Sequence, residues 1–192
     1  MVRADSNIQT LDDLSGHTVS IGAEESGTER NATQILEFAG MPSSLVATKN
    51  LDYIEATKEL KAGDIDAFFC TAGLTTTVID ELSKECDIRL IPLTDTVISK
   101  MLESSSAYTS EVIPAGTYTG QDTAISTIGV KSVLITKSDV SDDTIEQLTS
   151  LLFEKENELS YSNSLKLELT YDFATDGIPI PFHNGAKRYY ED

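Results

Sequence analysis

Residues 17–40, which read HTVSIGAEESGTERNATQILEFAG, place a strand, a small-residue turn and a helix in direct succession. The alternation of polar and apolar residues in 17–22 predicts a strand. Residues 27–39 carry apolar side chains on one helical face, and Gly40 ends the helix. This strand–turn–helix unit is the first of several that together predict an α/β fold.

Strands and helices keep alternating through the following part of the chain. The pattern predicts further strands at 44–50, 65–73 and 88–93, and further helices at 52–63, 74–85 and 94–105. This order favours a mainly parallel sheet with helices on both of its faces. The fold class expected from the sequence is therefore α/β.

The remainder of the chain has a different pattern. Residues 107–129 are rich in turn residues, and the apolar run VKSVLITK at 130–137 predicts a strong strand. A long helix capped by Ser141 or Asp142 is expected at 141–163, and the Pro/Gly-rich tail is expected to end in a short helix. Together with the preceding residues, the run at 130–137 forms the strand STIGVKSVLITK at 126–137, which would be a hinge between an α/β lobe before it and the helices after it.

Composition and charge limit the partners of this protein. The chain has 192 residues with a formal net charge of −18, and 40% of the residues are hydrophobic, so it can bury a core. This negative charge argues against nucleic acids and anionic membrane surfaces as partners. It does not exclude a small anionic ligand, because hydrogen-bond donors near the site determine binding rather than the net charge. The chain contains no run of about 18 apolar residues, the length needed to span a membrane. Its first residues also lack the apolar region of a signal peptide.

Cysteine and histidine are scarce. Cys70 lies in the apolar run IDAFFC and is expected to be a buried small side chain, whereas Cys86 lies in a polar stretch. A disulfide between them is an alternative that their spacing does not test. His17 and His183 are isolated, so the sequence predicts neither a metal site nor a catalytic histidine with a nucleophilic partner.

The segment SGTE, which begins the helix at 27–39, has two compatible interpretations. Ser26 and Glu29 form the pattern of a capping box, in which the serine caps the helix and the glutamate reaches back. The small residues Gly27 and Thr28 also leave backbone N–H groups accessible to a carboxylate or phosphate. The segment follows a strand, where α/β sheets commonly bind ligands. It is neither a phosphate loop nor the nucleophile elbow of a hydrolase.

A second segment, CTAGLTTT at 70–77, repeats this arrangement. Thr71, Ala72 and Gly73 follow a strand and are expected to open the helix at 74–85, although an ordinary threonine-capped turn would have the same sequence. Two such helix starts on one sheet predict a shared cradle for an anion.

Two tyrosines, Tyr108 and Tyr118, flank a Pro-Gly turn. Aromatic side chains in such a loop either line a pocket or pack beneath the loop. The sequence leaves both interpretations open.

Four segments together resemble the TAXI family of solute-binding proteins, which serve TRAP transporters. They occur in the family's order over nearly the whole chain, and they read SIGAEESGTERNATQILEFAG, GDIDAFFCTAG, IPAGTYTGQDTAISTIGVKSVLIT and GIPIPFHNGAKRYY. The resemblance implies a bilobed α/β protein with the type II periplasmic-binding-protein fold, whose lobes close on a ligand. It also implies capture of a small organic acid, such as glutamate or a dicarboxylate, and its delivery to a permease driven by an ion gradient.

The resemblance further implies how the chain is divided. Residues 14–126 correspond to a complete second lobe, and residues 127–192 to the returning crossover strand and C-terminal helices of the first lobe. The match covers the C-terminal two-thirds of the family's length, so the remainder of the first lobe and the signal peptide would lie upstream. The location implied is periplasmic or extracellular. An incomplete lobe would expose apolar helix faces, from which a dimer is expected.

On this resemblance, six residues are expected to contact the ligand: Ser26, Gly27, Thr28, Thr71, Gly73 and Tyr118. No catalytic residue, cofactor or metal is implied, so the expected function is binding rather than catalysis. Two alternatives stay open at this point. One is a ligand-sensing regulatory domain that uses the same clamp as a switch, and the other is an enzyme acting on small acids on the same fold.

Overall fold

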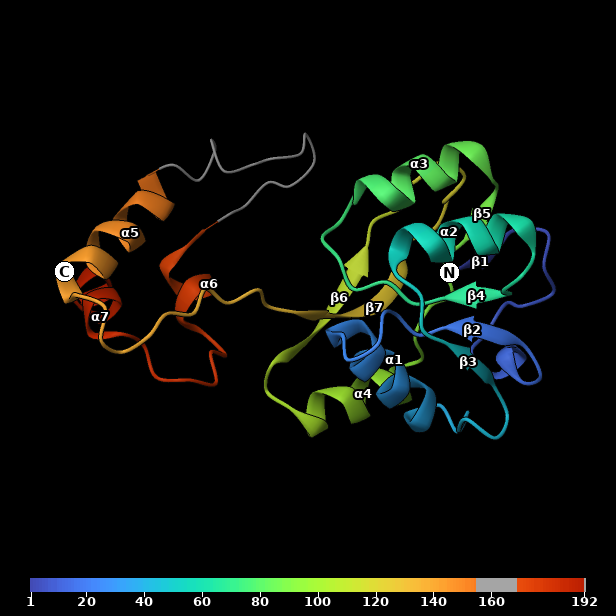
Figure 1. Cartoon of the computed structure of the whole chain (residues 1–192), viewed down its shortest axis with the longest axis horizontal. Coiled ribbons are helices and arrows are strands. Elements are labelled where there is room, and N and C mark those ends of the chain that lie inside the picture. The colour runs from blue at the N-terminus through green and yellow to red at the C-terminus, as the bar shows by residue number, and fades with distance from the viewer. Residues whose placement is uncertain (155–168, 192) are drawn as a thin grey trace. The chain divides into compact units, whose positions relative to one another are not determined.

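The computed structural model describes residues 1–154 and 169–191. The chain divides into two compact units, Met1–Gly129 and Val130–Asp192 (Figure 1). Both segments that the sequence predicts to bind a ligand lie in the first unit.

The first unit is built on a five-stranded sheet with the strand order β3-β2-β4-β1-β5. β2 is parallel to both of its neighbours, β3 and β4, whereas β1 is antiparallel to β4 and β5. Ser20 pairs with Phe68, so the carboxyl ends of β2 and β4 lie at the same edge of the sheet. The strands are β1 Val2–Arg3, β2 Thr18–Ser20, β3 Ala47–Lys49, β4 Ala67–Phe68 and β5 Ile88–Arg89.

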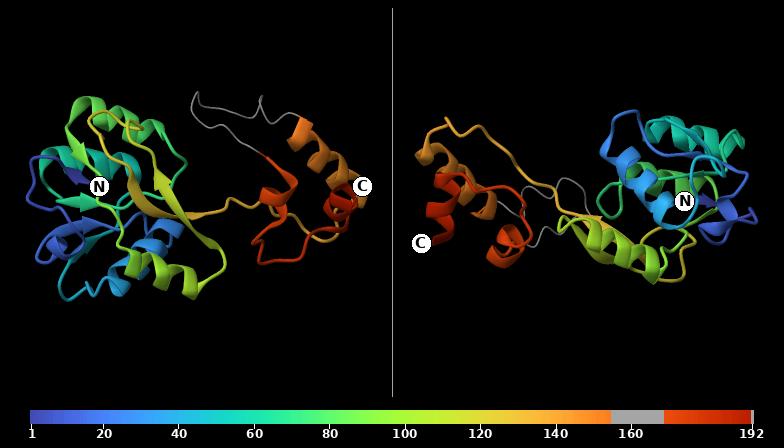
Figure 2. Two further views of the ribbon diagram at one scale, coloured as in Figure 1. Left: turned by 180° about the vertical axis from the view of Figure 1, so that it is seen from behind. Right: turned by 90° about the horizontal axis from the view of Figure 1, so that it is seen from below.

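Two helices cover each face of this sheet (Figures 1 and 2). α1 packs with α4 over one face, and α2 packs with α3 over the other. A short 3-10 helix, Asp12–Leu14, precedes β2. The predicted α/β class with helices on both faces is confirmed, but the sheet is mixed rather than mainly parallel, since two of its four strand pairings are antiparallel. The four helices are α1 Gly27–Phe38, α2 Tyr53–Ala62, α3 Thr77–Glu85 and α4 Asp95–Ser104.

Each helix pair buries apolar side chains against the sheet. The core beside α1 and α4 includes the fully buried Val19 and Met101, and the core beside α2 and α3 includes Leu60 and Phe68. Val2 is also fully buried, so the first residues of the chain belong to this unit. Burying side chains of this size stabilises the fold by about 1.5–3 kcal/mol each.

The strands are shorter than the sequence predicts, because apolar patterns continue past the paired residues. Val46 and Ile65, which precede β3 and β4, are buried in the core without belonging to a strand. The helices match their predicted positions more closely, because their ends carry local caps. α2 begins with a capping box between Asp52 and Glu55 and ends at Gly63, whose φ of 81° is left-handed.

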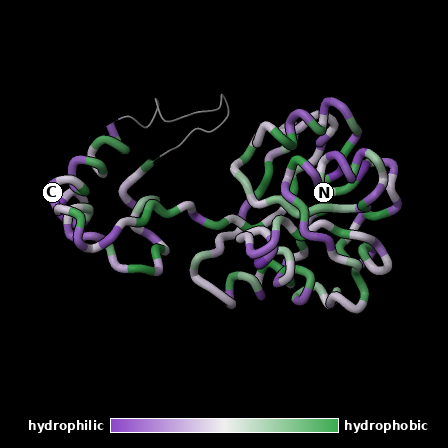
Figure 3. Tube along the Cα trace, in the orientation of Figure 1, coloured by the Kyte–Doolittle hydropathy of each residue, from purple (hydrophilic) through white to green (hydrophobic). Residues whose placement is uncertain are grey.

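A separate two-stranded sheet follows, formed by β6 Tyr108–Ile113 and β7 Ile125–Val130. The strand predicted at 126–137 is confirmed only up to Val130, where β7 ends, and residues 131–137 have no regular secondary structure. Figure 3 marks the apolar character of this run, in which Leu134 and Ile135 are 69% and 72% exposed. A strand needs a partner and a face to pack on, and the described residues supply neither to this run.

The second unit contains three described helices. Ser141 caps the first of them, since its Oγ accepts from the Thr144 N–H over 3.2 Å. The predicted long helix is confirmed from 142 to 154, and its remainder lies outside the described residues. No helix within residues 1–154 and 169–191 has the length and apolar character needed to cross a membrane. The helices are α5 Asp142–Glu154, α6 Tyr171–Thr175 and α7 Asn184–Glu191.

α5 and α7 pack closely because of a glycine. A Cβ at Gly185 would overlap the carbonyl oxygen of Asp142. Arg188 on α7 contacts Asp142 and Asp143 at the start of α5, each over 3.1 Å. Aromatic rings add to the packing of this unit. Neighbouring rings have centroids 5.1 to 6.2 Å apart, and the rings belong to Phe153, Tyr171, Phe182, Tyr189 and Tyr190.

Candidate functional site

The turn between β2 and α1 depends on Gly22. Its φ of 100° lies in the left-handed region, and a Cβ at this position would come within 2.7 Å of the Thr28 Cβ. A glycine is therefore required for the turn to pass this close to the start of α1. The turn places the N-terminus of α1 directly after the carboxyl end of β2.

Ser26 caps α1, because its Oγ accepts from the Glu29 N–H over 3.1 Å. The Glu29 side chain also reaches back, but to the Glu25 N–H over 2.6 Å rather than to that of Ser26. Asn50 donates to the second oxygen of this carboxylate over 2.8 Å. The carboxylate is thus engaged by the turn and lies beside the positive end of the helix dipole.

Two residues at the start of α1, the exposed Gly27 and the buried Thr28, have N–H groups without a backbone or side-chain acceptor among the described residues. The space beside Gly27 is open, since a Cβ placed there would meet no atom within 4 Å beyond its chain neighbours and its own helix. Free N–H groups and the helix dipole together attract an anion.

The structure brings Thr28 and Thr71 together through the hydroxyl group of Tyr53. Thr28 Oγ1 lies 2.6 Å from the Tyr53 hydroxyl. The same hydroxyl donates to the Thr71 carbonyl over 2.9 Å and accepts from the Thr71 N–H over 3.3 Å. The start of α1, the start of α2 and the loop after β4 therefore meet at one phenol.

Asn31 makes a second connection between α1 and this loop. Its Nδ2 donates to Thr71 Oγ1 over 3.3 Å, and its Oδ1 accepts from the Tyr108 hydroxyl over 2.9 Å. The Tyr108 hydroxyl also lies 3.2 Å from Gln34 Oε1. Tyr108 at the start of β6 is thereby tied to α1.

The sequence reasoning missed Tyr53 and Asn31. Asn31 lies four residues after Gly27 and so on the same face of α1, which is a signal that could have identified it. Tyr53 is the first residue of another helix, and no local pattern connects it with Thr28 or Thr71.

Thr71 and Gly73 are exposed in the loop after β4, but they do not open a helix as the sequence predicts. α3 begins at Thr77, and its N-cap, Thr76, makes no side-chain capping bond. The cause is Thr75, whose φ of 57° is left-handed and interrupts helical geometry. The loop therefore offers a hydroxyl and irregular backbone, not a second helix N-terminus.

Tyr118 lies apart from this group of hydrogen bonds. It is 5% exposed and packs beside α2 and α3 with Phe68 and Ile79. Burial raises the pKa of its hydroxyl. In the described part of the chain, no hydrogen bond joins that hydroxyl to Tyr53. Tyr118 packs in the core and also lines a second depression, together with Ile88, Leu90 and Gln121 among other residues, so both interpretations from the sequence stay open.

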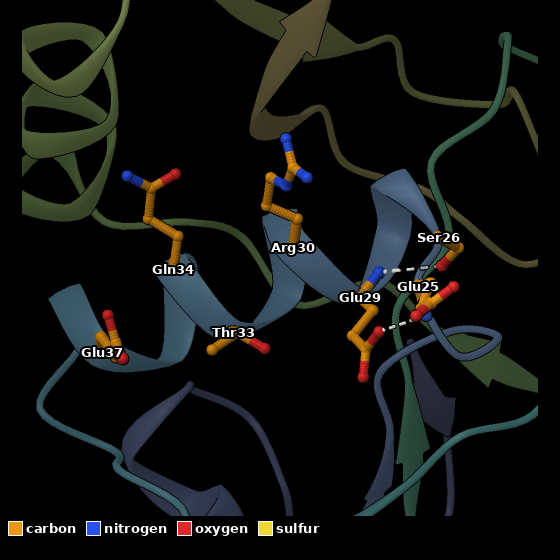
Figure 4. A pocket seen from close by; sticks show the side chains of 7 residues that line it. All are labelled: Glu25, Ser26, Glu29, Arg30, Thr33, Gln34 and Glu37. Carbon is orange, nitrogen blue, oxygen red and sulfur yellow. Dashed lines mark hydrogen bonds between the residues drawn. The ribbon is translucent and has the colours of Figure 1, made fainter.

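A shallow depression extends along α1 from its N-terminus (Figure 4). In Figure 4, Arg30 and Gln34 extend from one side of the helix. The lining carries three glutamates and one arginine, and two of these glutamates, Glu25 and Glu29, lie beside Ser26, so the depression itself does not favour an anion. The lining residues are Glu25, Ser26, Glu29, Arg30, Thr33, Gln34 and Glu37.

Cys70 precedes Thr71, and both it and Cys86 are free thiols, so the disulfide alternative is not formed. Burial raises the pKa of Cys70 to about 11. Its thiol is therefore neutral at pH 7 and a poor nucleophile. No group of three His, Cys, Asp or Glu side chains in residues 1–154 and 169–191 is placed to hold a metal ion.

Two comparisons relate this chain to known proteins. The structure is similar to that of the periplasmic aliphatic sulphonate binding protein SsuA from Escherichia coli, with a TM-score of 0.48 and 15% sequence identity. The similarity covers 99% of this chain and 52% of SsuA, so the chain spans about half the length of that protein. The model of the NMT1-like family matches residues 1–192. The chain therefore belongs to the NMT1-like family.

Proposed function

We propose that this chain is the ligand-binding part of an extracytoplasmic solute-binding protein that captures a small organic acid, such as glutamate or a dicarboxylate. The observation that carries this proposal is the pair of free N–H groups at Gly27 and Thr28, tied to Thr71 through Tyr53. Such donors suit a carboxylate without any positively charged side chain. The resemblance to TAXI proteins supports the same function.

The ligand contacts proposed are Ser26, Gly27, Thr28, Thr71 and Gly73, and Tyr118 is proposed on the TAXI resemblance alone. A helix N-terminus of this kind contributes roughly 1–2 kcal/mol to binding an anion. Micromolar affinity requires about 8 kcal/mol. A second lobe that closes on the ligand would therefore supply much of the affinity.

The two units suggest how such a clamp is assembled. Residues 14–126, within the first unit, are proposed to be the complete second lobe, and residues 127–192 the returning strand and C-terminal helices of the first lobe. Leu134 and Ile135 expose apolar side chains. This exposure supports the proposal that residues 127–192 pair with a sheet of the first lobe. The same surface supports self-association when that partner is absent.

The partner proposed for the loaded protein is the membrane permease of a TRAP-type transporter. Delivery to such a permease requires the protein to act in the periplasm or, in a cell without an outer membrane, at the extracellular face. These assignments rest on the TAXI resemblance.

A thermal-shift panel of small carboxylates, including glutamate and 2-oxoglutarate, tests the proposal. The panel is run on this chain and on the chain joined to the first-lobe segment that precedes it in TAXI proteins. Ligand at about ten times its Kd adds ~1.4 kcal/mol, which raises Tm by a few degrees for a protein of this size. A shift with unchanged ligand recovered afterwards supports binding without catalysis. No shift in either folded form contradicts the proposed ligand class.

A further inference from the structure

We propose that Tyr53 is a positioning residue that fixes the Thr71 loop against the start of α1, so that donors from both segments face the same anion. The inference rests on the proposed function, because it concerns the same site. It is drawn from the hydrogen bonds of one phenol that lies in neither of the predicted ligand-binding segments.

The loop that Tyr53 contacts has little else to hold it. Among the described residues, no backbone–backbone hydrogen bond involves residues 70–75. Thr71 is exposed, so packing does not fix it. The Tyr53 hydroxyl engages both the carbonyl and the N–H of Thr71. Tyr53 therefore supplies two hydrogen bonds to the backbone of this loop, while Asn31 bonds the side chain of Thr71.

The hydrogen-bonding capacity of the phenol is fully used. A phenol hydroxyl has one proton and two lone pairs. The Thr71 carbonyl can only accept, so the proton points to it, and the Thr71 N–H occupies one lone pair. The 2.6 Å contact with Thr28 then requires the Thr28 hydroxyl to donate to the second lone pair. Tyr53 has no capacity left for a ligand, which makes it a positioning residue rather than a contact.

The same reasoning identifies the donors that remain for an anion. Thr28 uses its hydroxyl proton on Tyr53, so it offers its N–H. Thr71 Oγ1 accepts from Asn31 and keeps its own proton for donation. The N–H groups of Gly27 and Thr28 and the hydroxyl of Thr71 are thus three donors, and Tyr53, together with Asn31, keeps the third beside the first two.

The variant Tyr53→Phe tests this role, because it keeps the ring and removes only the hydroxyl. Amide hydrogen exchange on the full chain, measured by NMR, follows the Thr71 N–H directly and needs no ligand. We expect this exchange to accelerate about tenfold, in line with the loss of its acceptor, while Val19 in the core keeps its rate. Tyr190→Phe removes a phenol hydroxyl from the second unit and is the matched control, for which Thr71 exchange stays unchanged.

Titration calorimetry with glutamate as the probe, on the chain joined to the first-lobe segment that precedes it in TAXI proteins, then measures the effect on binding. We expect the Kd of Tyr53→Phe to rise about tenfold over the wild type, which corresponds to ~1.4 kcal/mol, and that of Tyr190→Phe to stay unchanged. Thr28→Val cuts the same connection from the side of α1 and is expected to weaken binding in the same way. It provides the test if Tyr53→Phe does not fold.

Two results would overturn the positioning role: unchanged Thr71 exchange in Tyr53→Phe, or accelerated exchange with unchanged affinity. For Thr28→Val, unchanged affinity would have the same meaning. Failure of the wild type to bind any carboxylate is a different outcome. It would contradict the proposed function, while the exchange data would still decide whether Tyr53 holds the loop.

Discussion

Gly22 and Gly27 lie five residues apart, but the structure requires glycine at only one of these positions. Gly22 has a left-handed backbone and faces the side chain of Thr28 and the backbone of Glu29 at close range. Gly27 has open space around it. The first glycine therefore determines the approach of the turn to α1, and the second keeps the helix start accessible.

Gly22→Ala is expected to destabilise the protein by about 3 kcal/mol, because it adds a left-handed penalty to a contact that cannot be relieved. Urea denaturation measures this free energy of unfolding. Gly27→Ala is the matched control and is expected to change it by less than about 0.5 kcal/mol. Equal losses in the two variants would show that the turn does not need a glycine at position 22.

Gly27→Asp is expected to remove binding of the glutamate probe without unfolding the protein. A carboxylate at this position occupies the free N–H groups and is itself favoured by the helix dipole by about 0.3–1 kcal/mol. Calorimetry and thermal unfolding measure the two effects. Gly27→Asn has the same shape without the charge and should retain more affinity than Gly27→Asp. Equal affinity of the two variants would exclude an anion at this helix start.

Helices were the most predictable elements of this fold, because their signals are local. Ser26, Asp52 and Thr94 each cap a helix through a bond to a backbone N–H three residues later. Strands were less predictable, since they depend on neighbours that the sequence does not show. The run at 131–137 has the apolar pattern of a strand but lacks a partner among the described residues.

The residues of the candidate site also differ in how far the sequence alone could point to them. Ser26, Gly27 and Thr28 could be proposed from the sequence, because a cap and small residues follow one another along the chain. The start of α3 was misplaced, because the left-handed conformation of Thr75 is not apparent from a threonine-rich sequence. Tyr53 could not be identified, because its contact with Thr71 exists only once α2 and β4 have packed.

The N-cap of α2 should make a measurable contribution to the free energy of unfolding of the first unit. Asp52→Ala removes the side-chain oxygen that accepts from the Glu55 N–H over 2.8 Å. We expect a loss of about 1 kcal/mol in the free energy of unfolding, as for other N-caps. Asp122→Ala is the control, because Asp122 is exposed and makes no hydrogen bond through its side chain within the described residues. An equal effect of both variants would mean that lost charge, not the cap, explains the change.

The whole molecule carries a net charge of −18, which sets an unusual condition for binding an acid. Long-range repulsion acts against a negatively charged ligand, and the attraction must come from short-range donors. The two compact units are each held by their own core or aromatic cluster. The candidate site belongs to the first unit alone, so its chemistry can be tested there directly.

The charge predicts a distinctive salt dependence. Raising NaCl from about 20 to about 300 mM screens the repulsion between the protein and glutamate. We expect the affinity to stay constant or to rise up to a few-fold, because screening weakens both the repulsion and the attraction of the helix dipole, whereas direct hydrogen bonds from N–H and hydroxyl groups are retained. Calorimetry at several salt concentrations measures this. Affinity that falls as salt rises would indicate a site built on lysine or arginine instead.

The most direct measurement is an NMR titration of the ¹⁵N-labelled chain with glutamate and a panel of other small carboxylates, since chemical shifts detect weak binding as well as strong. The proposed function predicts that the amide signals of Gly27, Thr28 and Thr71 move together and saturate with one common Kd. Movement of signals at a different surface, or no movement with any carboxylate, would contradict a carboxylate site at the start of α1.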